Sequence, residues 1–434
     1  MKLHFPAPQN RSRLPWPSET RTMRGKSVPL LAGLLALAAC QTVPRRPAPP
    51  ELIGRATPDG FPASVRLVTT DMRTFTDLAP DFFAGIHAAA NAGKVSILAL
   101  SGGGSGGAYG AGALVGMSRA HTRPSFEMVT GVSAGALLAP FAFLGPAWDA
   151  RMQAAFTGGR SARLLRAPVR TILSRLLSPR GLPHRNALFQ LVDHFVTTEM
   201  IDAVAREAMK GRRLVVATTD LDKHETVLWN LGEIARHGGP AARRLFRDVL
   251  IASASVPGVF PPVLIRVHEG AREYDEMHVD GGVTTSVFSI PLIAGIQSIE
   301  LPLLRDAQFY MIVNGQLART PQTTRYNTVD IVSNALAAEM TYKTREAIVD
   351  NIAAARRLGM HFHLTEIPVD YPQASFIDFD QQHMQVLFDY AANCEVRGEL
   401  WLTPEQSIRR NMGPNRAPAS GLPACPAAAT HPPH

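Results

Sequence analysis

The sequence predicts an α/β fold with three layers, in which helices cover both faces of a mostly parallel central sheet. Strand-length apolar runs at Val95–Leu100, Leu214–Thr219 and Phe309–Val313 alternate with segments of helical periodicity. Two glycine clusters each follow a predicted strand and precede a predicted helix. The sequence shows no internal repeat, so a solenoid is excluded.

The remaining elements follow in chain order. Val65–Asp77 and Phe82–Asn91 are expected to begin the globular part. Shorter strands are expected at Phe126–Val129, at His224–Leu228, at His361–Leu364 and at a segment ending with Val279. Helices are expected at Ala134–Leu144, Asn186–Lys210, Ala241–Ser253, Thr328–Leu358 and Gln381–Asn393. Pro140 should kink or end the first of these helices early.

The composition fits one large domain or two small ones, because 46% of the 434 residues are hydrophobic. The net charge is +8, which by itself suggests an anionic partner. Residues 1–39, however, contain six Lys or Arg and one Glu, so +5 of this charge lies there and +3 lies in the remainder. The charge therefore does not predict nucleic-acid binding.

The N-terminus has the pattern of a targeting segment. Arg24 and Lys26 precede an apolar run of 11 residues, Pro29–Ala39, which is too short to span a bilayer. The run ends in Leu-Ala-Ala-Cys and resembles the processing site of bacterial lipoproteins, with Cys40 as the lipidated residue. We expect residues 1–39 to be a signal peptide whose true start is Met23; a buried N-terminal helix is the alternative.

The sequence around this segment predicts location and boundaries. Gln41 after the cysteine favours the periplasmic side of the outer membrane over inner-membrane retention. Residues 40–60 contain five prolines and are expected to form an extended tether. Residues 61–410 form the expected catalytic domain, and the Pro/Ala-rich tail 411–434 is expected to be disordered. Cys394 and Cys425 are either one disulfide or two free thiols.

A candidate nucleophile lies in the second glycine cluster. Gly131-Val132-Ser133-Ala134-Gly135 fits the Gly-x-Ser-x-Gly pattern, in which a serine occupies a tight strand-to-helix turn. Such a turn needs small neighbours, raises the hydroxyl above the sheet and places it at a helix N-terminus, where negative charge is favoured. Ser133 is therefore the candidate nucleophile.

The first glycine cluster supplies candidate oxyanion donors. Gly102, Gly103 and Gly104 follow a predicted strand, and Gly104 lies 29 residues before Ser133. Their N–H groups, with that of Ala134 in addition, can stabilise developing negative charge. Two alternatives were considered for this cluster. The dinucleotide pattern Gly-x-Gly-x-x-Gly also fits, with Glu127 as the acidic residue, but Glu127 lies inside an apolar run. The glycines can also serve only helix–strand packing.

A third motif, His-Val-Asp-Gly-Gly, places Asp280 147 residues after Ser133. The glycine loop, Gly-x-Ser-x-Gly and Asp-Gly-Gly, in this order, resemble the patatin-like phospholipases, and Val215–Asp220 and Ile251–Val263 add to the resemblance. It extends over Val95–Phe288, about half of the chain. The family's loop commonly has the sequence Asp-Gly-Gly-Gly-x-Arg-Gly.

This chain departs from that pattern, because Ser101 replaces the aspartate and Gly106 replaces the arginine. The backbone donors remain, whereas the contribution of the arginine to loop anchoring or to substrate charge is absent.

The resemblance implies a patatin-like sandwich and a serine acyl-ester hydrolase that works without histidine. In this interpretation Ser133 attacks, Asp280 is the base and an acyl-serine forms, with a phospholipid or lysophospholipid as substrate. Neither metal nor organic cofactor is implied. The implied site residues are Ser133 and Asp280, the oxyanion donors Gly102, Gly103 and Gly104, and the motif glycines Gly131, Gly135, Gly281 and Gly282.

Two other functions remain open. One is an α/β-hydrolase esterase in which His361, His363 or His383 completes a Ser-His-Asp triad. The other is an inactive lipoprotein that binds lipids or partner proteins. His361 and His363 alternate on a predicted strand, which favours packing over a metal site, and no Cys/His cluster has zinc spacing.

A basic segment follows the predicted nucleophile helix. Arg151–Arg185 contains eight arginines and no acidic residue. Within it, Pro168–Ser178 is expected to form an amphipathic helix that acts as a lid or contacts the membrane; an ordinary surface helix is the alternative.

Overall fold

The structure, a computed structural model, describes residues 45–53, 56–69, 72–90, 93–159, 187–289, 302–318, 321, 323–372, 378–411 and 421–428. The chain divides into two units, Met1–Thr42 and Val43–His434, and everything below concerns the second. The expected signal peptide, Cys40 and the expected helix Pro168–Ser178 lie outside the described residues.

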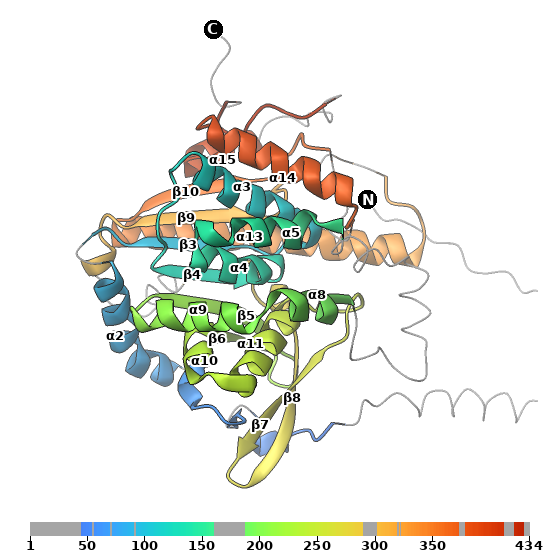
Figure 1. Cartoon of the computed structure of the whole chain (residues 1–434). Coiled ribbons are helices and arrows are strands. Elements are labelled where there is room, and N and C mark those ends of the chain that lie inside the picture. Colours follow the sequence, from blue (N-terminus) through green and yellow to red (C-terminus); the bar gives the residue numbers. More distant parts are fainter. Residues whose placement is uncertain are drawn as a thin grey trace, which may run out of the picture. The chain divides into compact units, whose positions relative to one another are not determined.

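One sheet runs through the described part of the chain (Figure 1). Its strand order is β1-β7-β8-β5-β4-β3-β9-β10, and β6 pairs with β5 and β2 beside this path. The strands are β1 (Thr57–Pro58), β2 (Arg66–Val68), β3 (Ser96–Leu100), β4 (Met128–Val132), β5 (Arg213–Asp220), β6 (Glu225–Asn230), β7 (Val263–Glu269), β8 (Arg272–Asp280), β9 (Gln308–Val313) and β10 (His361–Glu366). The strands β10, β9, β3, β4 and β5 are parallel, and the strands beyond β5 are antiparallel to their neighbours.

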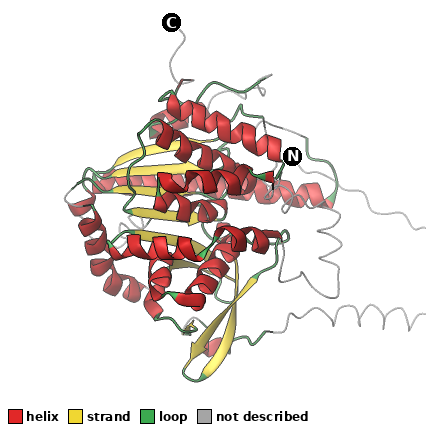
Figure 2. Cartoon of the chain, viewed as in Figure 1, coloured by secondary structure: helices red, strands yellow, loops and turns green. Residues whose placement is uncertain are grey.

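Helices cover both faces of this sheet (Figure 2). The helices are α2 (Met72–Ala89), α3 (Gly107–Arg119), α4 (Ala134–Leu144), α5 (Asp149–Thr157), α8 (Ala187–Phe195), α9 (Thr198–Met209), α10 (Leu231–His237), α11 (Gly239–Ser253), α13 (Thr328–Leu358), α14 (Gln381–Val396) and α15 (Pro404–Asn411). Within the described residues, none of these helices is both long and apolar enough to cross a bilayer.

Two separate hydrophobic cores correspond to the two faces. On β3, Leu98 and Leu100 pack with residues of α3, α4 and α14, whereas Ile97 and Ala99 pack with residues of α2 and α13. This division follows from the alternation of side chains along a strand. The predicted three-layer α/β fold class is confirmed, with the parallel strands grouped in one part of the sheet.

Most predicted elements lie where expected, and two departures are informative. Pro140 does not end α4, which continues to Leu144. Most of this helix is buried, so packing compensates for the hydrogen bond that proline cannot make. Strand β7 was not predicted, because its hairpin with β8 alternates buried and exposed residues and includes charged positions such as Arg266 and Glu269. The apolar run in β7 is only three residues long, at positions 263–265.

The segment expected to be a tether is bound to the domain from Arg45 onward. The Arg45 guanidinium pairs with Asp222 at 2.8 Å, and Arg46 and Asp275 exchange two hydrogen bonds through their main chains and the Asp275 carboxylate, at 2.9 and 2.8 Å. Strand β1 then pairs with β7 at the edge of the sheet, a position that tolerates Pro58. The expectation of an extended tether over 40–60 is therefore corrected for the described part.

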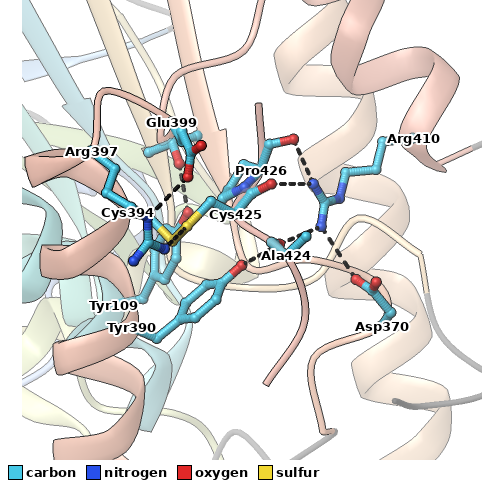
Figure 3. Close-up of a disulfide and its surroundings, with 11 residues drawn as sticks. Tyr109, Asp370, Tyr390, Cys394, Arg397, Glu399, Arg410, Ala424, Cys425 and Pro426 are labelled. Carbon is cyan, nitrogen blue, oxygen red and sulfur yellow. Dashed lines mark hydrogen bonds and ion pairs between the residues drawn. A yellow bond between two sulfur atoms is a disulfide. The ribbon is translucent and has the colours of Figure 1, made fainter. Parts of the chain in front are cut away.

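The C-terminal residues 421–428 are also packed against the domain. Cys394 of α14 and Cys425 form a disulfide, which decides between the two alternatives that the sequence left open (Figure 3). The Tyr390 hydroxyl donates to the Ala424 carbonyl at 2.9 Å, and Arg410 donates to the Cys425 carbonyl at 3.3 Å. The expected disorder of 411–434 is thus corrected for 421–428, because composition does not reveal a covalent link.

Candidate active site

Ser133 occupies the turn between β4 and α4 with φ 55° and ψ −122°. A side chain other than glycine is strained by about 1–3 kcal/mol in such a conformation and persists only where the surroundings fix it. Here the neighbours are packed without space for a side chain. A Cβ on Gly131 would lie 2.5 Å from the Gly135 carbonyl oxygen, and a Cβ on Gly135 would lie 2.4 Å from the Leu100 oxygen. Both glycines are therefore required by the turn that presents Ser133.

Ser133 and Asp280 are in direct contact. The Ser133 hydroxyl donates a hydrogen bond to Asp280 Oδ2 at 2.6 Å, and the Gly282 N–H donates to Asp280 Oδ1 at 2.7 Å. Burial raises the pKa of Asp280 to about 7, against the lowering effect of these two hydrogen bonds. The sheet order explains the contact, since β8 and β4 both neighbour β5. The structure thus brings together a hydroxyl and a carboxyl that titrates near neutral pH.

A glycine also fixes the end of β8. A Cβ on Gly281 would lie 2.5 Å from the carbonyl oxygen of Ala217 on β5. The motif glycines after Asp280 therefore have separate tasks: Gly281 permits close packing, and Gly282 supplies an N–H to the carboxylate.

The glycine loop after β3 lies against the nucleophile, since a Cβ on Gly102 would be 3.2 Å from the Ser133 Cβ. The Gly102 N–H donates to the Ser286 carbonyl at 3.0 Å, so it is not free to bind an oxyanion. This corrects the prediction of three donors from the loop. The N–H groups of Gly103, Gly104 and Ala134 make no hydrogen bond to any described residue.

Asn314, at the end of β9, anchors this loop. Its N–H donates to Ser101 Oγ at 2.8 Å, its Nδ2 donates to the Ser101 carbonyl at 2.7 Å, and its Oδ1 accepts from the Gly110 N–H at 3.2 Å. A Cβ on Gly106 would lie 2.1 Å from the Asn314 carbonyl oxygen. The position where the family commonly has arginine therefore has no space for any side chain, and Ser101 with Asn314 anchors the loop instead. Sequence reasoning missed Asn314, although a polar residue directly after a buried strand was a signal for it.

Ser133 opens onto a pocket of about 930 Å³, which we call the acyl pocket. Its described polar lining comes from Gly104, Ser105 and Ser133, and every other described lining residue is apolar. The walls come from α4, α5, α8, α9, α11, α14 and the segment after α11, with Phe141, Phe156, Leu191, Val192, Leu250 and Phe260 among them.

A second pocket of about 780 Å³ shares the glycine loop, and we call it the loop pocket. Gly102, Gly103 and Gly106 line it together with residues of α13 and the segment 313–316. Ser105 lines both pockets, whereas Ser133 lines only the acyl pocket.

Within the described residues, none of the three candidate triad histidines bonds Ser133; each has another partner. His363 stacks on Tyr310 with ring centroids 4.7 Å apart, and its Nε2 bonds Gln308 at 2.9 Å. The other two pairs are His361 with Asp306 and His383 with Asp378, at 3.7 and 2.8 Å. The described geometry favours the carboxylate alone as the partner of Ser133.

One buried cluster has the donor types of a metal site: Asp220, Glu276 and His278 lie with their ligand atoms within 4.8 Å of one another. However, the Arg66 guanidinium binds the Glu276 carboxylate through two nitrogens. Burial raises the pKa of Glu276, but His278 and Arg66 together lower it to about 2. Arg66 already supplies the positive charge, so the cluster is an ion-pair network and does not fit a cation.

The α/β fold and a serine–carboxyl pair beside a glycine loop and an apolar pocket define an acyl-ester hydrolase. Residues 98–291 match the family model of the patatin-like phospholipases, which confirms the resemblance over this part of the chain. The protein is a lipid acyl hydrolase.

Similar solved structures include VipD from Legionella pneumophila, with 13% sequence identity and a TM-score of 0.30. The similarity covers 73% of this chain and 69% of that one. Human GIVD cytosolic phospholipase A2 is similar at 9% identity and a TM-score of 0.36, covering 80% of this chain and 66% of that one. No curated protein sequence matches the chain.

Proposed function

We propose that the chain hydrolyses acyl esters of phospholipids or lysophospholipids, with Ser133 as nucleophile and Asp280 as base. The observation that supports this most directly is the 2.6 Å hydrogen bond between Ser133 and Asp280. Ser133 also lines a pocket whose other described walls are almost wholly apolar. Burying hydrocarbon there is favourable by about 0.8 kcal/mol per methylene, which suits a long acyl chain.

The positions of these groups support the following reaction. Asp280 accepts the hydroxyl proton while Ser133 Oγ attacks the ester carbonyl, and the N–H groups of Gly103, Gly104 and Ala134 stabilise the oxyanion. The ester C–O bond then breaks, and the leaving alcohol takes the proton from Asp280. Water attacks the acyl-serine, Asp280 accepts a proton from that water, and Ser133 regains its proton as the fatty acid leaves. Loss of one oxyanion donor typically costs about 3 kcal/mol.

The test is release of fatty acid from mixed phospholipid vesicles by the unchanged protein, Ser133→Ala and Asp280→Asn. We expect both variants to fold and to lose hydrolysis, and a fluorophosphonate probe to label Ser133 only where the serine is present. Turnover in folded Ser133→Ala equal to that of the unchanged protein would contradict the assignment. Absence of both turnover and labelling in the unchanged protein would instead favour an inactive lipid-binding lipoprotein.

We further propose that the protein is exported and lipid-anchored through Cys40 to the periplasmic side of the outer membrane. The apolar run before Cys40 supports this, and so does the Cys394–Cys425 disulfide, because disulfides persist in oxidising compartments. Mass spectrometry of the mature N-terminus should find the acyl groups on Cys40 and lose them in Cys40→Ser. An unmodified N-terminus, or one upstream of Cys40, would contradict the proposal.

A membrane surface is the proposed partner of the basic segment. Each basic residue near an anionic bilayer contributes about 1 kcal/mol, so three together change vesicle binding by roughly a hundredfold. Changing Arg170, Arg175 and Arg180 to Gln should therefore weaken hydrolysis of anionic vesicles, and added salt should have the same effect on the unchanged protein. Turnover of a short soluble ester should stay constant; an equal loss on both substrates would contradict this role.

A further inference from the structure

The last residue of α11 and the residues that follow it contact both members of the serine–carboxyl pair. Ser253, the last residue of α11, accepts a hydrogen bond from the Ser133 main-chain N–H at 3.0 Å through its Oγ. The same hydroxyl donates to the Ala217 carbonyl of β5 at 2.6 Å. The Ser253 side chain is fully buried, so water cannot replace either bond. This hydroxyl thus ties the nucleophile turn to the central strand.

Two residues further on, the Ser255 carbonyl accepts the Asp280 N–H at 3.0 Å. Ala254, between them, lines the acyl pocket. One short segment therefore fixes the main chain of Ser133 through a side chain and the main chain of Asp280 through a carbonyl. The distance between the two reacting groups depends on both attachments.

The bond from Ser253 has a specific consequence because Ser133 has a strained conformation. A turn with φ 55° returns to an unstrained backbone conformation unless hydrogen bonds fix its N–H and C=O groups. This change in the backbone also changes the direction of the side chain. A buried N–H without an acceptor costs about 1–3 kcal/mol, which is enough to shift such a turn. The bond also occupies the Ser133 N–H, so that group is not an oxyanion donor.

We propose that Ser253 is a positioning residue for the nucleophile: its hydroxyl holds the Ser133 turn so that Oγ remains in hydrogen-bond reach of Asp280. This inference rests on the proposed function. It assigns to Ser253 a role in geometry alone, because its described contacts are to the Ser133 N–H and the Ala217 carbonyl and not to the reacting atoms.

The chain offers a matched control in Ser255. Its side chain is equally buried, but its hydroxyl donates only to the Ile251 carbonyl within the end of α11, and its bond to Asp280 uses the main chain. Ser255→Ala therefore removes the same atom from the same segment and leaves both attachments in place. Ser253→Ala removes the acceptor of the Ser133 N–H.

The experiment measures kcat and KM on a short soluble ester for the unchanged protein, Ser253→Ala and Ser255→Ala. Ser253→Ala should lower kcat by about 10- to 100-fold with KM nearly unchanged, because misplaced reacting groups affect the chemical step. Fluorophosphonate labelling of Ser133 should slow by a similar factor. Ser255→Ala should remain within about twofold of the unchanged protein, since neither attachment is removed.

The pH profile separates positioning from a loss of stability. The hydrogen bond from Ser133 lowers the pKa of Asp280 against the effect of burial, so loosening this bond should raise that pKa. The acid limb of the rate profile should accordingly move to higher pH in Ser253→Ala and stay in place in Ser255→Ala. Thermal unfolding of each variant shows whether it is folded under assay conditions.

Further variants make the outcome decisive. Ser253→Thr retains the hydroxyl and should recover part of kcat. If Ser253→Ala does not fold, Ser253→Cys, which has a weak acceptor of similar size, should show the same fall in kcat and shift of the acid limb. Equal losses in Ser253→Ala and Ser255→Ala, or full activity in folded Ser253→Ala, would overturn the proposal. Failure of the proposed function is distinct, because the unchanged protein and Ser133→Ala would then behave alike.

Discussion

The acyl pocket and the loop pocket share the glycine loop but differ in what their walls offer a substrate. The described polar lining of the acyl pocket is confined to the neighbourhood of Ser133. The loop pocket has side chains with polar groups among its glycines and apolar residues, namely Ser105, Asn314, Gln316, Thr341, Thr344 and Tyr371. Most donor groups of this set are already used: the threonine hydroxyls donate to main-chain carbonyls of α13, and Gln316 Nε2 donates to carbonyls of the segment 368–371. The loop pocket thus has a more polar wall than the acyl pocket, although several of its donors already bond the main chain.

Under the proposed function, this difference predicts how a diacyl lipid would divide between the two pockets. The chain that is cleaved is expected in the acyl pocket, because Ser133 lines that pocket and not the other. The leaving half, with its glycerol and second chain, is expected in the loop pocket. Ser105, which lines both, then lies where the two halves of the substrate meet. A lysophospholipid or a short soluble ester needs less of the loop pocket.

The largest effect is expected from Asp280→Asn, because substrates in both pockets depend on one base. Turnover of every ester should fall by roughly 10²- to 10⁴-fold, the usual contribution of general base catalysis. In the unchanged protein, the rate should fall about tenfold per pH unit below about pH 7, because only the ionised Asp280 accepts a proton. A pH–rate profile on a soluble ester measures this, and a flat profile between about pH 5 and 8 would contradict it.

The Asp280 carboxyl should have opposite effects on activity and stability: Asp280→Asn lowers turnover but should raise the free energy of unfolding at neutral pH. Its pKa is about 7 in the folded protein and about 3.9 when unfolded. Because the folded value is raised, the contribution of Asp280 to the free energy of unfolding is complete below about pH 4 and is lost as pH rises through about 7. Asp280→Asn should therefore gain melting temperature over the unchanged protein, more at pH 8 than at pH 5. An equal difference at both pH values would count against the buried carboxylate.

Narrowing the acyl pocket should discriminate substrates by chain length. Val192 of α8 is buried and lines this pocket, and Val192→Phe adds a ring that fills part of it. Loss of the space for several methylenes, at about 0.8 kcal/mol each, should lower kcat/KM for long-chain esters by roughly 100-fold. A short soluble ester should change little, which also serves as the control for folding. Equal losses for long and short esters would remove the distinction between the pockets.

A change in the loop pocket should have a smaller effect that depends on the leaving half. Thr344→Phe should lower turnover of diacyl phospholipid by about tenfold, the value of one or two methylene contacts, and spare lysophospholipid and soluble ester. Glu346→Phe adds the same ring at an exposed residue of α13 outside the loop pocket and is the matched control. If Thr344→Phe slows all three substrates alike, the leaving half does not occupy this pocket.

The smallest effect on substrate choice is expected from the C-terminal disulfide. It closes a loop of 31 residues, and its removal should lower the free energy of unfolding by about 3 kcal/mol. Cys394→Ser combined with Cys425→Ser should therefore reduce the melting temperature and leave the ratio of diacyl to lysophospholipid turnover unchanged. Comparison with the reduced, unchanged protein provides the control. A changed ratio would mean that residues 421–428 shape the substrate pockets.

The sequence was sufficient to predict the groups whose local pattern contains their reason. Ser133 and its flanking glycines are specified by one turn, and Asp280 by the motif that ends a strand. The prediction that Gly102 is an oxyanion donor was wrong, because its N–H donates to the carbonyl of Ser286, a residue 184 positions away. That contact exists only in the tertiary structure.

Ser253 and Asn314 were missed for a related reason. Each acts through side-chain hydrogen bonds to the main chain of a distant segment, and such bonds require a polar side chain but no sequence pattern around it. Strand β7 and the packed residues 421–428 were missed because half-exposed strands and Pro/Ala-rich segments resemble loops in composition. Tertiary pairing and a disulfide determine their structure instead.

The packing of Gly106 against Asn314 also limits how this loop can evolve. The obstructing atom is a main-chain carbonyl oxygen 2.1 Å from a Cβ at Gly106, so no substitution at Asn314 can remove it. Placing the arginine that the family commonly has at this position would require the end of β9 to move together with the loop. Single steps toward that arginine should therefore be deleterious on their own, and the two anchoring arrangements are separated by a fitness valley.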